Sequence, residues 1–244
     1  MVAVIEDLEL YEAQTLDEFV DTYYGEEIVI SESDFELLHL LRKSFTVVTG
    51  KKGSGKTMTA VRCAWLLKHV FGLEVVTDFR MRPAFGSHVA VTMRQIVDFL
   101  DKLVDIAEID LDDAEGAEMA LRGLSKKLGF SLFNVAILLD EAYKYADCRD
   151  NRSKVTKIFT RWISQVRHFN SAMIWMAPHD DMLDKRITRQ IDFLGSCYSA
   201  RDLPVCYTIL EDLEDGVSYK LKLEKSKWGQ LFESENKLGI YARL

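Results

Sequence analysis

A chain of 244 residues with 48% hydrophobic and 29% charged residues has the composition of a globular protein with one sizeable core. Its formal net charge of −8 argues against a surface that binds polyanions everywhere, although a local basic patch is compatible with it. No apolar run approaches the roughly 18 residues of a membrane span, and Glu6 and Asp7 stand where a signal peptide would carry positive charge.

The first 40 residues are acidic, with aromatic side chains between the carboxylates. Four apolar residues recur there at helical spacing and predict one helix face: Leu16, Phe19, Val20 and Tyr23. We expect residues 1–40 to form an arm that packs on the main domain, residues 41–244, or on a neighbouring subunit. A docking segment for a partner is the alternative.

The stretch SFTVVTGKKGSGKT, from Ser44 to Thr57, carries the strongest motif of the chain. Its apolar, β-branched first part predicts a buried strand, and apolar residues at helical spacing from Ala60 to Phe71 predict a helix after it. The residues between fit the phosphate-loop pattern G-x-x-x-x-G-K-[ST] at every fixed position: Gly50, Lys51, Lys52, Gly53, Ser54, Gly55, Lys56 and Thr57. A glycine-rich turn before an ordinary helix is the alternative, which the flanking strand and helix disfavour.

Glycines let the N–H groups of such a loop point at phosphate oxygens, and the helix start adds unpaired N–H groups beneath them. We therefore predict an ATP-binding set that runs from Gly50 through Met58. Lys56 is expected to neutralise the β- and γ-phosphates, and the Thr57 hydroxyl to bind Mg²⁺.

Beyond this helix, which we expect to end at Gly72, residues 73–79 and 89–92 read as strands. Residues 96–104 have a helical pattern. The acidic stretch 105–118 predicts a solvated helix–loop–helix insertion.

The apolar run Val135 to Leu139 predicts a central parallel strand that is covered on both faces. Asp140 and Glu141 follow it, at the end of the strand where ligands bind in open α/β sheets. We expect Asp140 to serve the Mg²⁺ site and Glu141 to polarise the attacking water. A helix N-cap is the alternative reading of an isolated Asp-Glu pair. With the phosphate loop upstream, the pair favours the additional-strand, RecA-like branch, and the absence of an N-K-x-D element favours ATP over GTP.

Residues 172–177, 191–198 and 205–209 also read as strands, and the alternation in 217–223 predicts a half-buried antiparallel edge strand. The predicted fold is a three-layer α/β P-loop NTPase with a mainly parallel central sheet and antiparallel additions at its C-terminal end. The four cysteines lack metal-site spacing and indicate reduced thiols.

From Asp140 to Asn170 and beyond, the sequence resembles the genome-packaging ATPases of the FtsK–HerA superfamily, as found in tailless icosahedral viruses with internal membranes. The elements that carry the resemblance are Asp-Glu-Ala with Tyr143, Gln165-Val166-Arg167, the D-K-R-I-x-R of Asp184 to Arg189, and Trp228 to Glu235. The likeness covers Ser44 to about Glu235.

This resemblance implies an Mg²⁺-dependent ATPase that drives double-stranded DNA into a preformed capsid. It implies a homo-oligomeric ring of five or six subunits, with capsid or membrane vertex proteins as partners, in the host cytoplasm or at a virion vertex. An arginine of the adjacent subunit would meet the γ-phosphate charge. The matched elements favour Arg167 and Arg186 for this role, while Arg149 and Arg152 stay in contention. The family carries a sensor glutamine after its fourth strand, where this chain has His179.

DNA contact would use basic residues on the phosphate backbone without base reading, and the candidates are Arg80, Arg82, Lys126, Lys127, Arg149, Arg152 and Lys154. Two alternatives stay open. One is a Zot-like motor of virion assembly or extrusion, whose relatives usually carry a membrane-spanning helix after the ATPase domain. The other is a nucleotide-gated structural protein that does not hydrolyse ATP, against which Glu141 argues.

Overall fold

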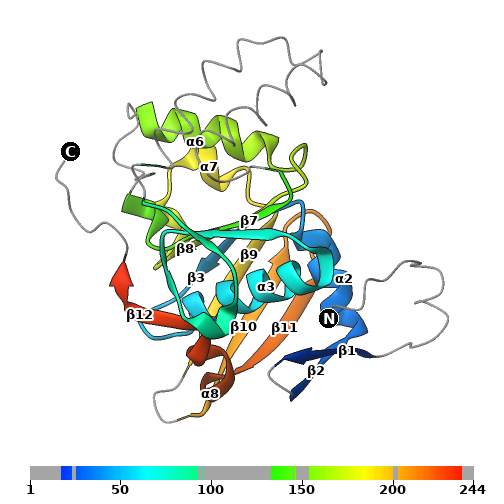
Figure 1. The fold of residues 1–244 in the computed structure, drawn as a ribbon. Coiled ribbons are helices and arrows are strands. Elements are labelled where there is room, and N and C mark those ends of the chain that lie inside the picture. Colours follow the sequence, from blue (N-terminus) through cyan, green and yellow to red (C-terminus); the bar gives the residue numbers. More distant parts are fainter. Residues whose placement is uncertain are drawn as a thin grey trace.

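The computed structural model describes residues 18–23, 26–92, 95, 133–144, 146, 154–199 and 203–237. An eight-stranded sheet runs through its centre in the order β11-β10-β9-β3-β8-β7-β4-β6 (Figure 1). The strands are β3 (Phe45–Thr49), β4 (Glu74–Thr77), β6 (Val89–Ala90), β7 (Val135–Leu139), β8 (Ala172–Ala177), β9 (Phe193–Tyr198), β10 (Val205–Asp212) and β11 (Ser218–Glu224).

The sheet is parallel from β9 to β6 and antiparallel at its other end, where β10 pairs with both β9 and β11. Strand β8 lies between β3 and β7, which is the inserted strand that the acidic pair predicts. The predicted fold class is therefore confirmed. Every residue of β7 and β8 is buried, whereas β10 and β11 largely alternate between exposed and less exposed residues, because parallel strands are covered on both faces and these antiparallel ones on one.

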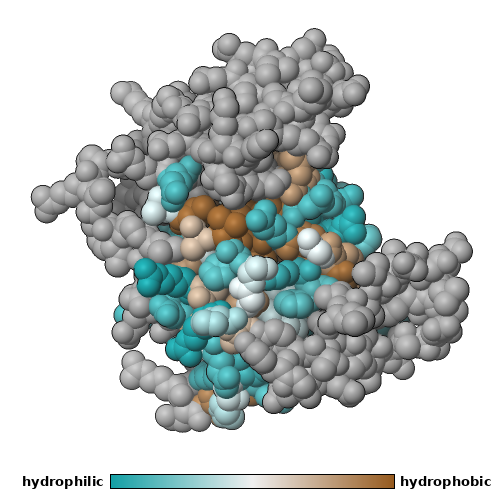
Figure 2. Space-filling model, in the orientation of Figure 1, coloured by the Kyte–Doolittle hydropathy of each residue, from teal (hydrophilic) through white to brown (hydrophobic). Residues whose placement is uncertain are grey.

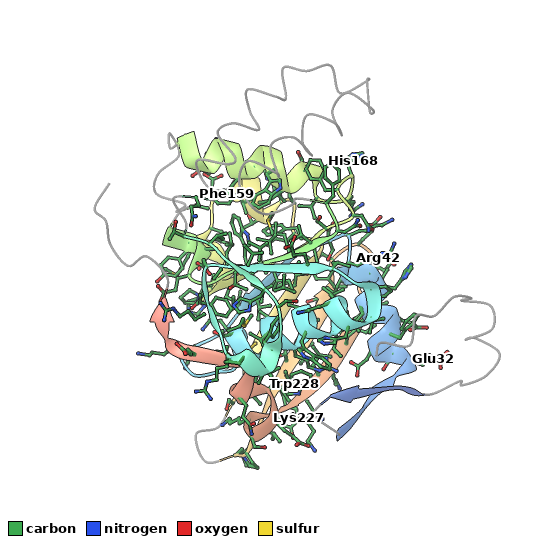
Figure 3. The ribbon with its side chains drawn as sticks, viewed as in Figure 1. Glu32, Arg42, Phe159, His168, Lys227 and Trp228 are labelled. Carbon is green, nitrogen blue, oxygen red and sulfur yellow. The ribbon has the colours of Figure 1, made fainter. Side chains whose placement is uncertain are left out.

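Helices cover both faces of the parallel part, on opposite sides of the sheet in Figure 1. One layer holds α2 (Glu32–Leu41), α3 (Lys56–Phe71) and α8 (Lys225–Trp228), and the other holds α6 (Lys154–Gln165) and α7 (Lys185–Thr188). Each layer has its own core. Trp65 of α3 is fully buried in the first, and in the second the ring of Trp175 packs edge-on against Phe45 and Phe159, at 5.2 and 5.1 Å between centroids. Figure 3 labels Phe159 and Trp228, which mark the two layers.

The predicted helix face in the N-terminal segment is wrong where the structure describes it. Residues Glu18–Tyr23 form strand β1, which pairs antiparallel with β2, Glu26–Ser31. The β-branched residues of these two strands favour a hairpin over a helix. The helix α2 that follows buries Leu37, Leu38 and Leu41 in the core of the α3 layer.

The predicted strand 73–79 is interrupted by Asp78, so that β4 is followed by a separate strand β5, Phe79–Met81. Strand β5 pairs with β12, Phe232–Lys237, outside the main sheet. Short 3₁₀ turns complete the described chain: η1 (Pro83–Phe85), η2 (Ala142–Lys144), η3 (Asp180–Met182) and η4 (Gly229–Leu231). The predictions for 96–104 and 105–118 lie outside the described residues.

On the face shown in Figure 2, most of the hydrophobic colouring lies in a band across the middle, and the rest of the described surface is mainly hydrophilic. Among the helices that the structure describes, none is long and apolar enough to cross a membrane.

Candidate active site

The loop between β3 and α3 has the backbone that phosphate binding requires. Gly50, Gly53 and Gly55 have φ values of 143°, 79° and 107°, which side-chain-bearing residues rarely adopt. Gly55 directly precedes Lys56, the first residue of α3, and the first turn of α3 contains no acidic residue. A helix start presents backbone N–H groups to an anion, and at α3 no carboxylate of the first turn competes for them, as anion binding at a helix start requires.

Two side chains of the loop are arranged for an anionic ligand. Lys56 Nζ donates hydrogen bonds to the carbonyl oxygens of Gly50 (2.7 Å) and Lys51 (3.1 Å), so the ammonium group spans the loop. Ser54 is 6% exposed, and within the described ranges its Oγ has no hydrogen-bond partner. A buried hydroxyl without a partner costs about 1–3 kcal/mol, and a phosphate oxygen would remove that cost.

The loop rests on β9 and β10 so closely that two glycines have no room for a side chain. A Cβ on Gly55 would lie 2.6 Å from Cys206 Sγ, and a Cβ on Gly50 would lie 2.5 Å from Ser54 Oγ and 2.9 Å from the carbonyl oxygen of Cys197. Both cysteines are buried, and burial raises the pKa of each thiol. They are protonated packing groups at neutral pH, as the sequence predicts for its cysteines.

Beneath the loop, the hydroxyls of Thr59 and Thr208 are 2.6 Å apart, and Cys197 Sγ lies 3.2 Å from the Thr208 hydroxyl. These buried contacts join the first turn of α3 to β9 and β10. Met58, the last residue of the predicted nucleotide set, packs into the core with its sulfur 3.6 Å from Cys206 Sγ. Only its backbone N–H is therefore available to a ligand.

Asp140 and Glu141 directly follow β7, at the same edge of the sheet as the phosphate loop. The Asp140 carboxylate accepts a hydrogen bond from the Glu141 N–H at 2.9 Å. Glu141 has φ of 53°, a left-handed backbone that costs a non-glycine residue of order 1–3 kcal/mol and is concentrated at functional sites. This turn sets the direction in which the Glu141 side chain leaves the strand.

Asp78 belongs to this acidic edge, and our sequence reasoning missed it. It is 6% exposed at the end of β4, the strand beside β7, and its carboxylate accepts the Asp140 N–H at 2.9 Å. A signal was present in the sequence, because two neighbouring apolar strands both end in aspartate. Asp78 holds the backbone from which Asp140 and Glu141 project.

Magnesium would be held here by few protein ligands. In the described part of the chain, no three His, Cys, Asp or Glu side chains are grouped to hold a metal by themselves. Mg²⁺ in nucleotide sites typically takes one or two protein oxygens together with phosphates and water. The hydroxyl of Thr57 and the carboxylate of Asp140 are oxygen donors of that kind.

His179 follows β8, the strand between β3 and β7, and the Gly50 N–H donates to the Pro178 carbonyl at 3.1 Å. His179 lines a cavity of about 610 Å³ together with Gly50, Lys51 and Ser54 of the loop, and residues at the end of β9 and near the start of β10 complete its lining. The predicted sensor position is therefore next to the phosphate loop.

Arg167 does not reach the phosphate loop of its own chain. Its guanidinium pairs with Asp192 at 2.5 Å, and the other carboxylate oxygen of Asp192 accepts the N–H of Phe45, the first residue of β3. The phosphate loop begins at the other end of that strand, about 16 Å away at roughly 3.3 Å per residue. The hydrogen bond and charge of Asp192 raise the pKa of Arg167.

Arg186 forms a two-pronged pair with Asp184, at 2.8 and 2.9 Å. A role of either arginine at a neighbouring copy stays a prediction.

Of the candidate DNA contacts, Arg80 on β5 and Arg82 after it are exposed, and Lys154 is the first residue of α6. Lys126, Lys127, Arg149 and Arg152 lie outside the described residues.

The family model described as zonular occludens toxin (Zot) matches residues 44–205. None of the curated proteins compared with the chain matches it.

Several solved structures have a similar shape. The N-terminal domain of zonular occludens toxin from Neisseria meningitidis is 12% identical, with a TM-score of 0.46 over 78% of this chain and 98% of that one. B204, the DNA-packaging ATPase from Sulfolobus Turreted Icosahedral Virus, is 17% identical, with a TM-score of 0.48 over 73% and 96%. The genome packaging NTPase B204 from Sulfolobus turreted icosahedral virus 2, in complex with ATP-gammaS, is 15% identical, with a TM-score of 0.43 over 73% and 97%.

Proposed function

The chain belongs to the zonular occludens toxin (Zot) family, whose model spans residues 44–205, and we propose that it is an ATP-hydrolysing motor of virus assembly or genome packaging. The observation that carries the proposal is a phosphate loop of three positive-φ glycines at the same sheet edge as Asp140 and Glu141. Family membership agrees with the P-loop ATPase resemblance of the sequence.

In this function, Lys56 and the N–H groups at the start of α3 hold the β- and γ-phosphates, and the Ser54 hydroxyl gains a hydrogen-bond partner. Thr57 and Asp140 would hold Mg²⁺, which when bound neutralises charge on the phosphate oxygens. Glu141 accepts a proton from the water that attacks the γ-phosphate. Asp78 keeps the Asp140–Glu141 turn in place through the Asp140 N–H.

Two tasks for the motor are supported by different observations. The Gln-x-Arg and D-K-R-I-x-R elements support translocation of double-stranded DNA into a capsid by a ring of five or six subunits. Family membership supports virion assembly or extrusion. In either task, hydrolysis would involve an arginine from the adjacent subunit, and the motor would act with capsid or membrane vertex proteins in the host cytoplasm or at a virion vertex.

The test is ATP hydrolysis by the full chain with and without duplex DNA, for the native protein and Glu141→Gln. We expect the variant to bind ATP but to lose turnover by about 100-fold or more, as loss of a general base predicts. Glu74→Gln is the matched control, since Glu74 is an exposed carboxylate at the start of β4, the opposite edge of the sheet.

Stimulation by DNA supports translocation, and hydrolysis that is indifferent to DNA supports the assembly motor. Tight ATP binding without any hydrolysis by the native chain would contradict the enzymatic proposal and favour a nucleotide-gated structural protein.

A further inference from the structure

The 610 Å³ cavity beside the phosphate loop is lined by two unlike groups of residues, which we call its two walls. Gly50, Lys51 and Ser54 of the loop form one, and the other is aromatic, with Tyr198 at the end of β9 and Tyr207 on β10. Its volume lies within the roughly 300–1,000 Å³ that is usual for small-molecule sites. Because Gly50, Lys51 and Ser54 line the cavity, it is within reach of a ligand whose phosphates occupy the loop.

The two tyrosines are held side by side by the sheet. Tyr198 and Tyr207 are directly opposite each other in the antiparallel β9–β10 pair, so their side chains project from the same face. Their chain neighbours Cys197 and Cys206 point the other way, into the core under the loop. The register that packs the cysteines against the phosphate loop therefore puts both phenol rings on the opposite face of β9 and β10, and both tyrosines line the cavity.

Both rings are unusually exposed for large aromatic side chains, at 58% for Tyr198 and 45% for Tyr207. An aromatic ring gains most when a flat apolar partner covers it, and stacking of a nucleic-acid base on an aromatic side chain is a common form of this contact. A ligand that joins an anionic group to a flat aromatic one matches the two walls of the cavity. A nucleoside triphosphate is such a ligand.

We infer that the base of the bound nucleotide stacks on Tyr198 and Tyr207, in the cavity between the phosphate loop and the β9–β10 end of the sheet. The inference rests on the proposed function and adds the residues that bind the nucleoside half. It requires no specific hydrogen bond to the base, because the π face of any base can stack. His179, Ser196 and Ser199 supply polar groups in the same cavity for the ribose.

The experiment compares two ligands that differ by the nucleoside. Binding of ATP and of inorganic tripolyphosphate, each with Mg²⁺, is measured by titration calorimetry on the full chain. We expect Tyr198→Ala and Tyr207→Ala each to weaken ATP binding by about 5- to 150-fold, the range for one lost stacking contact, and to leave tripolyphosphate binding unchanged. Tyr198→Phe keeps the ring and should keep the affinity for ATP.

Ile209→Ala is the matched control, because Ile209 is two residues from Tyr207 on the same face of β10 and does not line the cavity. Equal ATP affinity in the native chain and both tyrosine variants overturns the inference, as does equal weakening by Ile209→Ala or an equal loss of tripolyphosphate binding. Lys56→Ala distinguishes the stacking inference from the proposed function, since this variant should weaken the binding of both ATP and tripolyphosphate. Native protein that binds neither ligand refutes the proposed function itself.

Discussion

The glycines of the phosphate loop are required for different physical reasons. Gly53 and Gly55 both have positive φ, with values of 79° and 107°. A Cβ on Gly53 would meet nothing within 4 Å, whereas a Cβ on Gly55 would lie 2.6 Å from Cys206 Sγ and 3.0 Å from Cys206 Cβ. Gly53 is therefore required for its backbone alone, and Gly55 for both its backbone and the close approach of α3 to β10.

This difference predicts unequal effects of two identical substitutions. Gly53→Ala should lower the free energy of unfolding by about 1–2 kcal/mol, the cost of a left-handed alanine. Gly55→Ala should lower it by about 1–3 kcal/mol more, because the added methyl group overpacks against Cys206. Urea unfolding followed by circular dichroism measures both.

Removing the Cys206 sulfur tests whether overpacking against Cys206 causes the larger loss of stability in Gly55→Ala. Cys206→Ala in the Gly55→Ala background should recover part of the lost stability, since the 2.6 Å contact disappears. Equal losses in the two glycine variants would show that packing on β10 is unimportant.

At the scale of elements, α7 has only four residues and depends on its surroundings. A helix this short has no stability of its own. Asp184 is 2% exposed, caps the helix by accepting the Arg186 N–H, and donates its own N–H to the Ala146 carbonyl at 2.9 Å. Leu183 and Ile187 anchor the same segment in the core of the α6 layer. The Asp184 carboxylate therefore holds the D-K-R-I-x-R element in its folded position.

Asp184→Ala should lower the free energy of unfolding at pH 7 by about 1–2 kcal/mol through the lost cap. The hydrogen bonds from Arg186 hold the pKa of the Asp184 carboxyl below its ordinary value. The stabilisation that the ionised Asp184 carboxylate gives the folded state is therefore fully present above the ordinary carboxyl pKa, about 3.9. It is lost as the pH falls through the lower pKa that Asp184 has in the folded protein.

Denaturant unfolding at a series of pH values between about 7 and 2 tests this sign. The difference between native protein and Asp184→Ala should be constant near neutrality and shrink at the acid end. Asp181→Ala, at an exposed position inside η3 rather than at its N-cap, serves as control and should change little. A difference that grows on acidification would contradict the assignment.

The whole molecule is asymmetric in a way that bears on assembly. One end of its sheet is parallel and covered by helices on both faces, and the other end is antiparallel with Tyr207 and Ile209 exposed. Arg167 lies at the edge opposite its own phosphate loop, with a side chain that is 62% exposed. An arginine in that place can meet a γ-phosphate only in another copy of the chain.

Mixing two variants that are each impaired in ATP hydrolysis tests this directly. Arg167→Ala keeps an intact phosphate loop, and Lys56→Ala keeps the arginine. If Arg167 acts between subunits, each variant alone should hydrolyse ATP about 10-fold or more slowly than native protein, and an equal mixture should recover part of the activity. Phosphate release per subunit is the measurement.

A mixture of Arg186→Ala and Lys56→Ala tests Arg186 in the same way, and Lys220→Ala, at an exposed position on β11, is the control for a general loss of charge. Absence of recovery in both mixtures would contradict catalysis between subunits by either residue.

Local patterns in the sequence were sufficient for much of the fold and of the candidate site. The phosphate loop, the buried strand before Asp140 and the helix that ends at Gly72 depend on spacings of a few residues, and hydrophobic period distinguishes strand from helix over such distances. The inserted strand was predicted from the Asp140–Glu141 pair, and the antiparallel end from the alternation of residues 217–223. The same approach gave a wrong prediction for the acidic N-terminal segment. Apolar residues at positions 16 to 23 fit a helix, whereas the β-branched residues favour the observed hairpin.

Only the tertiary structure decided which distant residues meet. Asp78 lies 62 residues before Asp140 and accepts its N–H because β4 and β7 are neighbours in one sheet. Cys206 excludes a side chain at Gly55, and Tyr198 and Tyr207 share a cavity with the loop, because the β9–β10 register brings them there. Short-range patterns in a sequence encode backbone conformation, whereas contacts across a sheet depend on strand order and register. The phosphate-binding half of the site could thus be predicted from the sequence, and its surroundings required the fold.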